Sequence, residues 1–216
     1  MKQPVKIDSS HFNYLGPDID DQDTYNELPA EFQILLKQQN GYIRYSGAFH
    51  MRGCCLEPEW HSLAKYWKGE MALSDLYPNI QPDDIPFAEN AFGDQLFFRD
   101  NSVWYMNGET GNIACYNRNL HEFLQLIDED PTTHLNCPLL EPFLANGGVI
   151  EPGQLLHAYP PLITNHPSEN LTITPVPQDQ QLGSLAQLAA FFAKMNNKKS
   201  NSIFTKVKSL FSKKNK

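Results

Sequence analysis

Four residues between positions 50 and 61 carry side chains that bind metal ions or act as nucleophiles. They are His50, Cys54, Cys55 and His61. A structural zinc site uses paired ligands with spacings such as C-x2-C and H-x3-H, and the arrangement H-x3-C-C-x5-H matches neither. We therefore expect ordinary buried thiols and a packed histidine here, and we predict no metal ion and no other cofactor.

A pair of carboxylates suited to acid–base catalysis flanks the Phe92-Gly93 turn. These residues are Glu89 and Asp94, but an Asp at a turn more often accepts hydrogen bonds from nearby backbone amides. The sequence has no phosphate-binding glycine-rich loop, no dinucleotide fingerprint and no local signature of cysteine–histidine catalysis. It therefore predicts no catalytic residues and a protein that is not an enzyme.

The N-terminal region contains a dense acidic cluster, and these are the candidate partner-binding residues: Asp18, Asp20, Asp21 and Asp23. The spacing is not that of an EF-hand calcium loop, which needs a central glycine and a terminal glutamate. A solvated loop and a binding surface for a protein remain as alternative interpretations.

Charge is divided unevenly along the 216 residues, whose net charge is −8. From Lys194 onward there are eight lysines and no acidic residue, so the first 193 residues carry a net charge of −16. An acidic body disfavours direct nucleic-acid binding, which needs cations against the phosphates. It favours a basic protein partner, although an acidic surface also simply keeps a protein soluble.

The predicted strands and helices of the body are centred on a stretch from Ile85 to Tyr116. Three short apolar runs separated by Asn, Asp and Gly predict an antiparallel meander covered on both faces: Gln95–Arg99, Val103–Met106 and Asn112–Tyr116. A helix follows, with Asn119 and Glu122 in capping-box positions and an apolar stripe of Leu120, Phe123, Leu124 and Ile127. This pattern predicts an α+β fold with a central antiparallel or mixed sheet.

Helices are also predicted from Pro29 to Gly41 and from Pro58 onward, and Gly93 and Gly111 are expected to adopt positive φ. We divide the chain into a polar N-terminal segment (1–27), one domain (28–193, with 137–193 as a packed extension) and a basic lysine-rich tail (194–216).

The tail has the pattern of a basic amphipathic helix that begins near Ser202, after a polar tether at 196–201. Its candidate membrane or partner contacts are Ile203, Phe204, Val207, Leu210 and Phe211. Such a helix binds anionic membrane surfaces weakly, here through 202–216, or docks into a groove of a partner. A disordered solubilising tail and a helix folded back on the acidic body are the alternatives.

An ordered set of short motifs runs through the body. It comprises Leu28-Pro29, Asn40-Gly41, Ile85-Pro86-Phe87-Ala88, Phe92-Gly93-Asp94, Gly108-Glu109-Thr110-Gly111 and Leu120 to Leu124. The set resembles the SUKH superfamily, which includes bacterial immunity proteins and the fungal Smi/Knr cell-wall-assembly regulators. The resemblance covers roughly residues 28–193. It implies an α+β fold and brings no catalytic motif.

The resemblance and the charge together predict a non-catalytic binding module, an immunity protein that neutralises a basic bacterial toxin, often a nuclease in this family, by direct binding. The alternative is a regulatory or scaffold binding protein associated with a membrane through its tail. We expect a cytoplasmic location, because no apolar signal region follows the first residues and the four cysteines lack a disulfide spacing.

Overall fold

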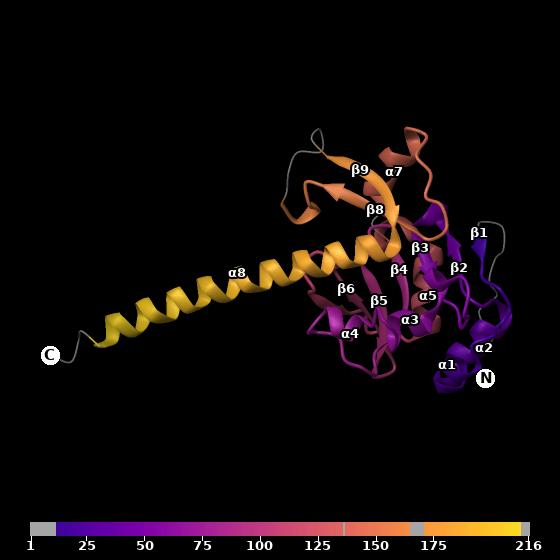
Figure 1. Cartoon of the computed structure of the whole chain (residues 1–216), viewed down its shortest axis with the longest axis horizontal. Helices are drawn as coiled ribbons and strands as arrows, with labels where there is room; N and C mark the ends of the chain where they lie inside the picture. Colours follow the sequence, from indigo (N-terminus) through magenta and orange to yellow (C-terminus); the bar gives the residue numbers. More distant parts are fainter. Residues whose placement is uncertain (1–11, 136, 165–170, 213–216) are drawn as a thin grey trace.

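The computed structural model describes residues 12–135, 137–164 and 171–212, and for residues 137 and 196–212 it describes the backbone alone. Seven strands form one antiparallel sheet whose spatial order follows the chain (Figure 1). They are β1 (Phe12–Leu15), β2 (Tyr42–Arg44), β3 (Phe49–Met51), β4 (Ile85–Asn90), β5 (Gln95–Arg99), β6 (Ser102–Met106) and β7 (Ile113–Cys115). The predicted α+β fold with a central sheet is therefore confirmed, and each neighbouring pair is antiparallel.

The predicted meander is present as strands β5, β6 and β7. The β5–β6 hairpin turns on Asp100 and Asn101, with φ of 52° and 58°, because Asp and Asn tolerate the left-handed region better than most residues. The turn sets a register in which Phe98 faces Val103. Strand β4, which precedes the meander, is buried along its whole length and lies at the centre of the sheet.

Helices and short 3-10 turns surround this sheet. They are α1 (Gln22–Glu27), α2 (Ala30–Gln38), η2 (Tyr45–Gly47), η3 (Glu59–His61), α3 (Leu63–Trp67), α4 (Leu73–Leu76), α5 (Leu120–Glu129), α6 (Pro131–His134), α7 (Cys137–Ala145), η4 (Leu162–Thr164) and α8 (Gln178–Ser212). The capping box that opens α5 joins Asn119 and Glu122, as predicted.

Both faces of the sheet are covered, because alternate residues of one strand enter different clusters. Phe98 packs with α2 and α5 in the larger core, in which Phe123 is fully buried with its ring 6.3 Å from that of Phe87. Phe97 packs on the opposite side with Tyr77 and with residues of α8. The predicted covering of the meander on both faces is therefore confirmed for β5. The prediction that the whole meander lies in the sheet interior is wrong for β7, which pairs only with β6 at the edge of the sheet and has no buried residue.

The extension at 137–193 adds a second, two-stranded sheet, β8 (Gln154–Tyr159) with β9 (Thr172–Pro177). A backbone hydrogen bond of 2.7 Å from Leu156 N to Ala91 O connects this hairpin to the main body. Leu155, Leu182 and Leu185 bury Tyr66 of α3. The extension thus packs on the body, as expected, although the sequence analysis had not identified β8.

The structure corrects the predicted N-terminal boundary at residue 28. Strand β1 and helix α1 both lie within the segment expected to be a polar loop. β1 pairs with β2 and its alternate residues are half buried, so two aromatic residues, Phe12 and Tyr14, are enough to hold an edge strand. The expected helix from Pro58 is also interrupted, because Ser62 is extended between η3 and α3.

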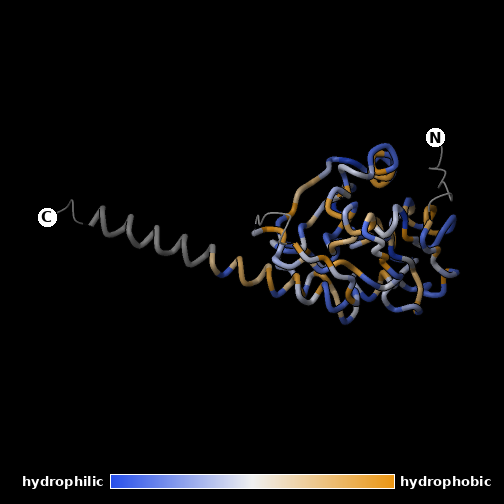
Figure 2. The backbone as a smooth tube through the Cα atoms, turned by 90° about the horizontal axis from the view of Figure 1, so that it is seen from above, coloured by the Kyte–Doolittle hydropathy of each residue, from blue (hydrophilic) through white to orange (hydrophobic). Residues whose placement is uncertain are grey.

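The tail likewise differs from the prediction of a separate helix after a flexible tether. A single helix, α8, runs from Gln178 through residues 196–201 to Ser212 (Figure 1). No glycine or proline occurs at 196–201 to end it. The side chains predicted as tail contacts, Ile203 to Phe211, lie outside those described. In the hydropathy view, apolar segments alternate with polar ones where α8 crosses the body (Figure 2). Among the described residues, no helix is both long and apolar enough to cross a membrane.

Candidate functional site

Two of the predicted metal and nucleophile candidates, His50 and His61, meet in the interior. Nε2 of His50 lies 2.9 Å from Nδ1 of His61, and Nε2 of His61 lies 2.9 Å from the carbonyl oxygen of Asn40. On the other side, Nδ1 of His50 lies 2.9 Å from Oε1 of Glu89. All three side chains are buried. The sequence analysis expected one packed histidine; the structure instead pairs two of them with a carboxylate.

An ion pair completes this interior cluster. Nη2 of Arg52 donates to Oε2 of Glu89 and to Oε1 of Gln95, both at 2.8 Å, and its guanidinium lies 4.4 Å from the centre of the Tyr66 ring. Gln95 Nε2 also donates to Glu89 at 3.0 Å. We call His50, Arg52, His61, Glu89 and Gln95 the buried polar network. A buried charge needs such partners because desolvation is otherwise too costly.

The buried polar network has one hydrogen atom fewer than its hydrogen bonds require when both histidines are neutral. The contacts from Glu89 to His50, from His50 to His61 and from His61 to Asn40 each need one hydrogen, and two neutral imidazoles supply two. Burial, together with the nearby His50, nevertheless lowers the pKa of His61 to about 3. Burial also lowers the pKa of His50, although Glu89 opposes this. Both rings are therefore neutral near pH 7, and the third proton enters only in acid.

Glu89 stays ionised in the same surroundings. Burial acts to raise its pKa, but Arg52 and the hydrogen bonds to His50 and Gln95 lower it by more. Asp94 belongs to a different cluster, where it accepts from Tyr105 Oη at 2.7 Å and from the backbone N–H of Gly108 at 2.8 Å. The two carboxylates proposed as an acid–base pair are therefore not partners, and Asp94 has the backbone-binding role that its turn position favoured.

The cysteines have a structural environment. Cys54, Cys55 and Cys115 are free thiols, and the first two are fully buried. Burial raises the pKa of Cys54 and of Cys55 to about 12, with nearby acidic residues adding to the rise. A thiol with so high a pKa is a poor nucleophile and a poor metal ligand at neutral pH. In the described part of the chain, no group of three His, Cys, Asp or Glu residues is placed to hold a metal ion.

Glycines that pack around His61 are a feature that the sequence analysis missed. Gly41 has φ of 74°, and a Cβ there would lie 2.6 Å from the His61 ring and 2.6 Å from Met51 O. At Gly53 a Cβ would lie 2.4 Å from Asn40 O. His61 therefore fits only because the facing backbone carries no side chains, a requirement that becomes visible once the strands are paired.

The predicted acidic cluster is ordered and adjoins the Cys54–Glu57 segment. Asp21 caps α1 by accepting from Thr24 N at 3.0 Å, and Asp20 accepts from Leu56 N at 2.8 Å. Asp18 and Asp23 are exposed, whereas Asp21 is buried. The structure thus replaces the expected solvated loop by a fixed surface.

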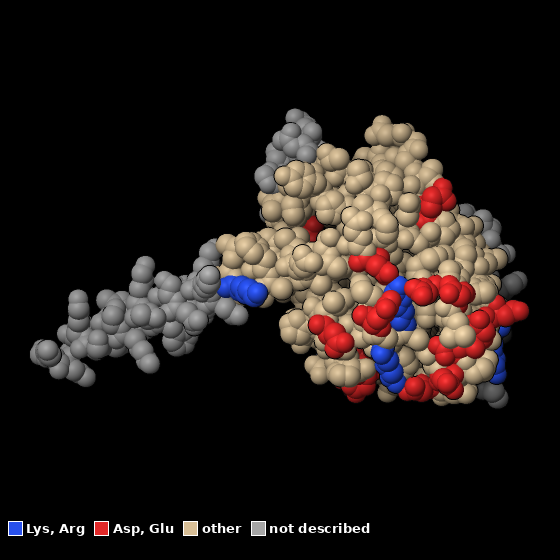
Figure 3. Space-filling model, in the orientation of Figure 1, with Lys and Arg blue, Asp and Glu red and all other residues tan. Residues whose placement is uncertain are grey.

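Further carboxylates extend this surface. Lys65 pairs with Glu59, Glu70 and Asp179, and Lys68 pairs with Glu27. These contacts connect the cluster to α3 and to the start of α8, and Figure 3 shows acidic side chains dominating the region over α1 and α3. We call this surface the acidic face. Its carboxylates are Asp18, Asp20, Asp21, Asp23, Glu27, Glu57, Glu59, Glu70 and Asp179, and its three lysines are Lys65, Lys68 and Lys37, the last of which lines a depression together with Asp18.

An exposed leucine lies within the acidic face. Leu56 is 63% exposed, and it lines a shallow depression together with Glu59 and Glu70. Exposed apolar side chains with a polar rim are typical of protein–protein contact surfaces. The depression can therefore receive an apolar anchor while the surrounding carboxylates attract cationic side chains.

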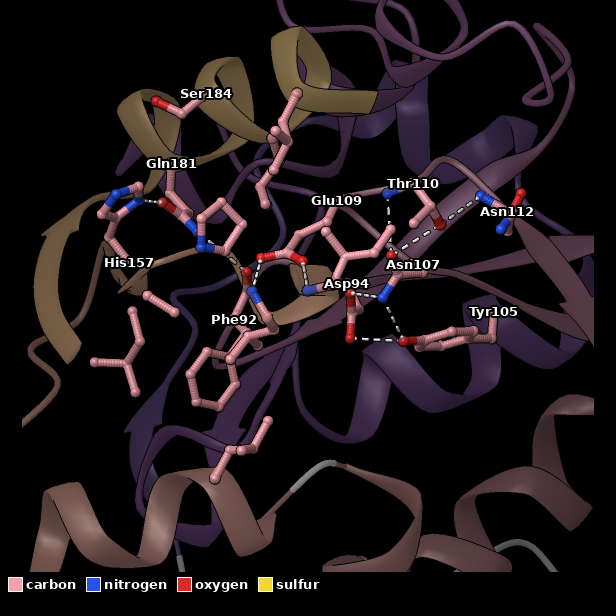
Figure 4. A pocket seen from close by; sticks show the side chains of 18 of the residues that line it. Phe92, Asp94, Tyr105, Asn107, Glu109, Thr110, Asn112, His157, Gln181 and Ser184 are labelled. Carbon is pink, nitrogen blue, oxygen red and sulfur yellow. Dashed lines mark hydrogen bonds between the residues drawn. The ribbon is translucent and has the colours of Figure 1, made fainter. Parts of the chain in front are cut away.

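A separate cavity of about 520 Å³ lies between the β6–β7 hairpin, β8, η4 and α8 (Figure 4). Glu109 lines the cavity, and its carboxylate accepts hydrogen bonds from Leu162 N at 2.8 Å and Ile163 N at 2.6 Å. His157 Nδ1 lies 2.9 Å from Gln181 Oε1. None of these residues was predicted as functional, because the segments that enclose the cavity are distant in sequence.

The fold and these surfaces define an α+β protein with an antiparallel meander, an acidic face and a cavity with a largely apolar wall. No family model matches the chain, and no curated protein matches it. Among solved structures, it is similar to the crystal structure of Atu4351 from Agrobacterium tumefaciens, with a TM-score of 0.52 and 15% sequence identity. The match covers 83% of this chain and 85% of that one. At this identity the likeness shows the fold alone.

Proposed function

We propose that this chain is a non-catalytic protein-binding module of the immunity type, which neutralises a basic toxin by covering it with the acidic face. The supporting observation is the ordered acidic face around Leu56, where nine carboxylates outnumber three lysines. Opposite charges steer association, and a central apolar anchor adds affinity once the surfaces meet. The resemblance to SUKH immunity proteins suggests the same role, and a nuclease is the kind of toxin it implies.

The chemistry of the interior also supports binding over catalysis. The histidines, the ion pair and the two adjacent thiols are inaccessible, and the thiols have raised pKa values. A catalytic group has to reach its substrate. The proposal places the protein in the cytoplasm, where an immunity protein meets its toxin and where thiols stay reduced.

The product of a neighbouring toxin gene provides the direct test. Co-purification of a one-to-one complex, together with restored growth of cells that produce the toxin, is the expected result. The informative variant is Leu56→Arg, because it adds a cation at the anchor position on an exposed side chain and leaves the core intact. It should weaken binding at least tenfold, whereas the exposed Ile34→Arg on α2 should not. Absence of both complex and rescue would overturn the proposal.

A second function is a regulatory or scaffold binding protein associated with a membrane through its basic tail. The continuous helix α8 favours it, since the helix carries residues 194–212 of the lysine-rich tail beyond the body (Figure 1). Each lysine near an anionic surface contributes about 1 kcal/mol, so binding is expected to be weak. Liposome sedimentation of full-length protein and of protein lacking 196–216 tests it; equal partitioning onto anionic vesicles at low salt would exclude membrane contact.

A further inference from the structure

The cavity between the β6–β7 hairpin and α8 has the size and composition of a ligand site. Its volume of about 520 Å³ falls within the range of small-molecule pockets. We propose that it binds a small amphipathic amine, a molecule with an aromatic or branched apolar body and one cationic nitrogen. This proposal rests on the cavity alone and does not depend on the acidic face or on the immunity role.

Apolar side chains from separate elements form most of the cavity wall. Phe92 comes from the β4–β5 turn, Leu156 from β8, and Leu185 and Leu188 from α8 (Figure 4). Burial of an apolar ligand body against such walls contributes roughly 25 cal/mol for each Å² removed from water. The wall therefore selects for a ligand with an apolar body, not for a sugar or another fully polar ligand.

The charged residues that line the cavity determine whether it prefers a cationic or an anionic ligand. Two acidic residues, Asp94 and Glu109, line the cavity, and no lysine or arginine is among its described lining residues. Both oxygens of Glu109 accept from neutral backbone N–H groups, and among the described residues no lysine or arginine pairs with it. In a partly enclosed space of low dielectric this charge attracts a cation and repels an anion.

A hydrogen-bonded pair of polar side chains, Gln181 and His157, also lines the cavity. Gln181 Nε2 donates to Phe92 O at 3.3 Å, which orients the amide so that its oxygen faces His157 Nδ1. Because that oxygen only accepts, Nδ1 of His157 carries the hydrogen of this contact. The hydrogen-bonded pair adds a polar element to a wall that is otherwise mostly apolar.

Three probes with the same indole body but different charge test the proposal: tryptamine (cationic), 3-methylindole (neutral) and indole-3-acetate (anionic). At ten times its dissociation constant, tryptamine should raise the unfolding midpoint by about 4 °C. We expect it to bind at least fivefold more tightly than 3-methylindole, with no binding of indole-3-acetate. Equal binding of all three probes, or no binding of tryptamine, would overturn the proposal.

A pair of arginine variants on α8 locates the site. Leu188→Arg places a cation at the half-buried lining position and should abolish tryptamine binding. Gln187→Arg adds the same charge at the next residue, which is exposed and does not line the cavity, and should leave binding unchanged. Chemical-shift changes that centre on His157 are expected in the wild type. Tryptamine binding that survives Leu188→Arg would place the site elsewhere and refute the assignment.

Discussion

Carboxylates occupy two contrasting regions of this protein. Glu89 is fully buried in the sheet, where it is bound by Arg52, His50 and Gln95. Glu57 on the acidic face is exposed and has no ion-pair partner among the described residues. Desolvation forces an interior charge to be paired, whereas water and salt solvate a surface charge. The comparison shows that an interior carboxylate of this chain is held by several partners within the fold, whereas Glu57 on the acidic face remains exposed to solvent.

Removing the interior carboxylate should have the largest effect. Glu89→Ala leaves Arg52 buried without its counter-ion and should lower the free energy of unfolding by about 3 to 5 kcal/mol. Glu57→Ala on the acidic face should change it by less than about 0.5 kcal/mol. Urea unfolding of both variants measures the difference. Similar losses for the two variants would show that burial does not distinguish the regions.

The pH dependence of stability should follow the interior groups. The unfolded chain protonates histidine near pH 6.5, whereas the native pKa of His61 is about 3, so the unfolded state binds more protons between these values. Stability should therefore fall as pH drops below about 6.5, and the lowered pKa of Glu89 extends the loss below about pH 4.5.

The buried thiols should determine how the stability of the folded state declines at alkaline pH. Cys54 and Cys55 ionise near pH 9 when unfolded but only near 12 in the native state, so stability should decline as pH rises above 9. Unfolding midpoints measured from pH 4 to 10 should show a plateau between about 6.5 and 9. A stability that increases on acidification below pH 6 would contradict the neutral state of the two histidines.

Two glycine substitutions compare an open surface position with a packed interior position, and we expect smaller losses of stability from them than from Glu89→Ala. Gly147→Ala places a side chain at φ of 81° in open space and should cost about 1 kcal/mol through backbone strain. Gly41→Ala adds the same strain at φ of 74° and also forces contact with Met51 O and the His61 ring, so its cost should approach 3 kcal/mol. Equal costs in thermal unfolding would mean that the packing around His61 adjusts freely.

The central fold was predictable from local patterns. Short apolar runs separated by turn residues predicted β5, β6 and β7, and an apolar stripe preceded by a capping box predicted α5. These elements were predictable because the residues that form each signal lie close together in the sequence. Five residues, Phe98, Val103, Tyr105, Phe123 and Ile127, are expected to be buried in one core. Four of them are, whereas Tyr105 is only partly buried against that core. Gly93 and Gly111 have the positive φ expected at tight turns.

The candidate sites were less predictable, because they depend on contacts between distant segments. His50 and Glu89 meet through the pairing of β3 with β4, and the cavity needs four elements at once. The continuous α8 was missed because a polar composition at 196–201 was interpreted as a tether, although polarity alone does not end a helix. The acidic cluster was found, but its attachment to Leu56 through Asp20 had no local signal.

The central claim is that the acidic face binds a basic protein, and the association rate with the toxin tests it most directly. Neutralising three exposed carboxylates of the face (Asp18→Asn, Asp23→Asn and Glu57→Gln) should slow association about tenfold at low salt and flatten its salt dependence. The matched control changes three exposed carboxylates on other elements: Asp100→Asn, Glu129→Gln and Glu141→Gln. We predict that the control retains most of the wild-type rate. An association rate that is independent of ionic strength, or equal slowing in both variants, would contradict the role of the acidic face.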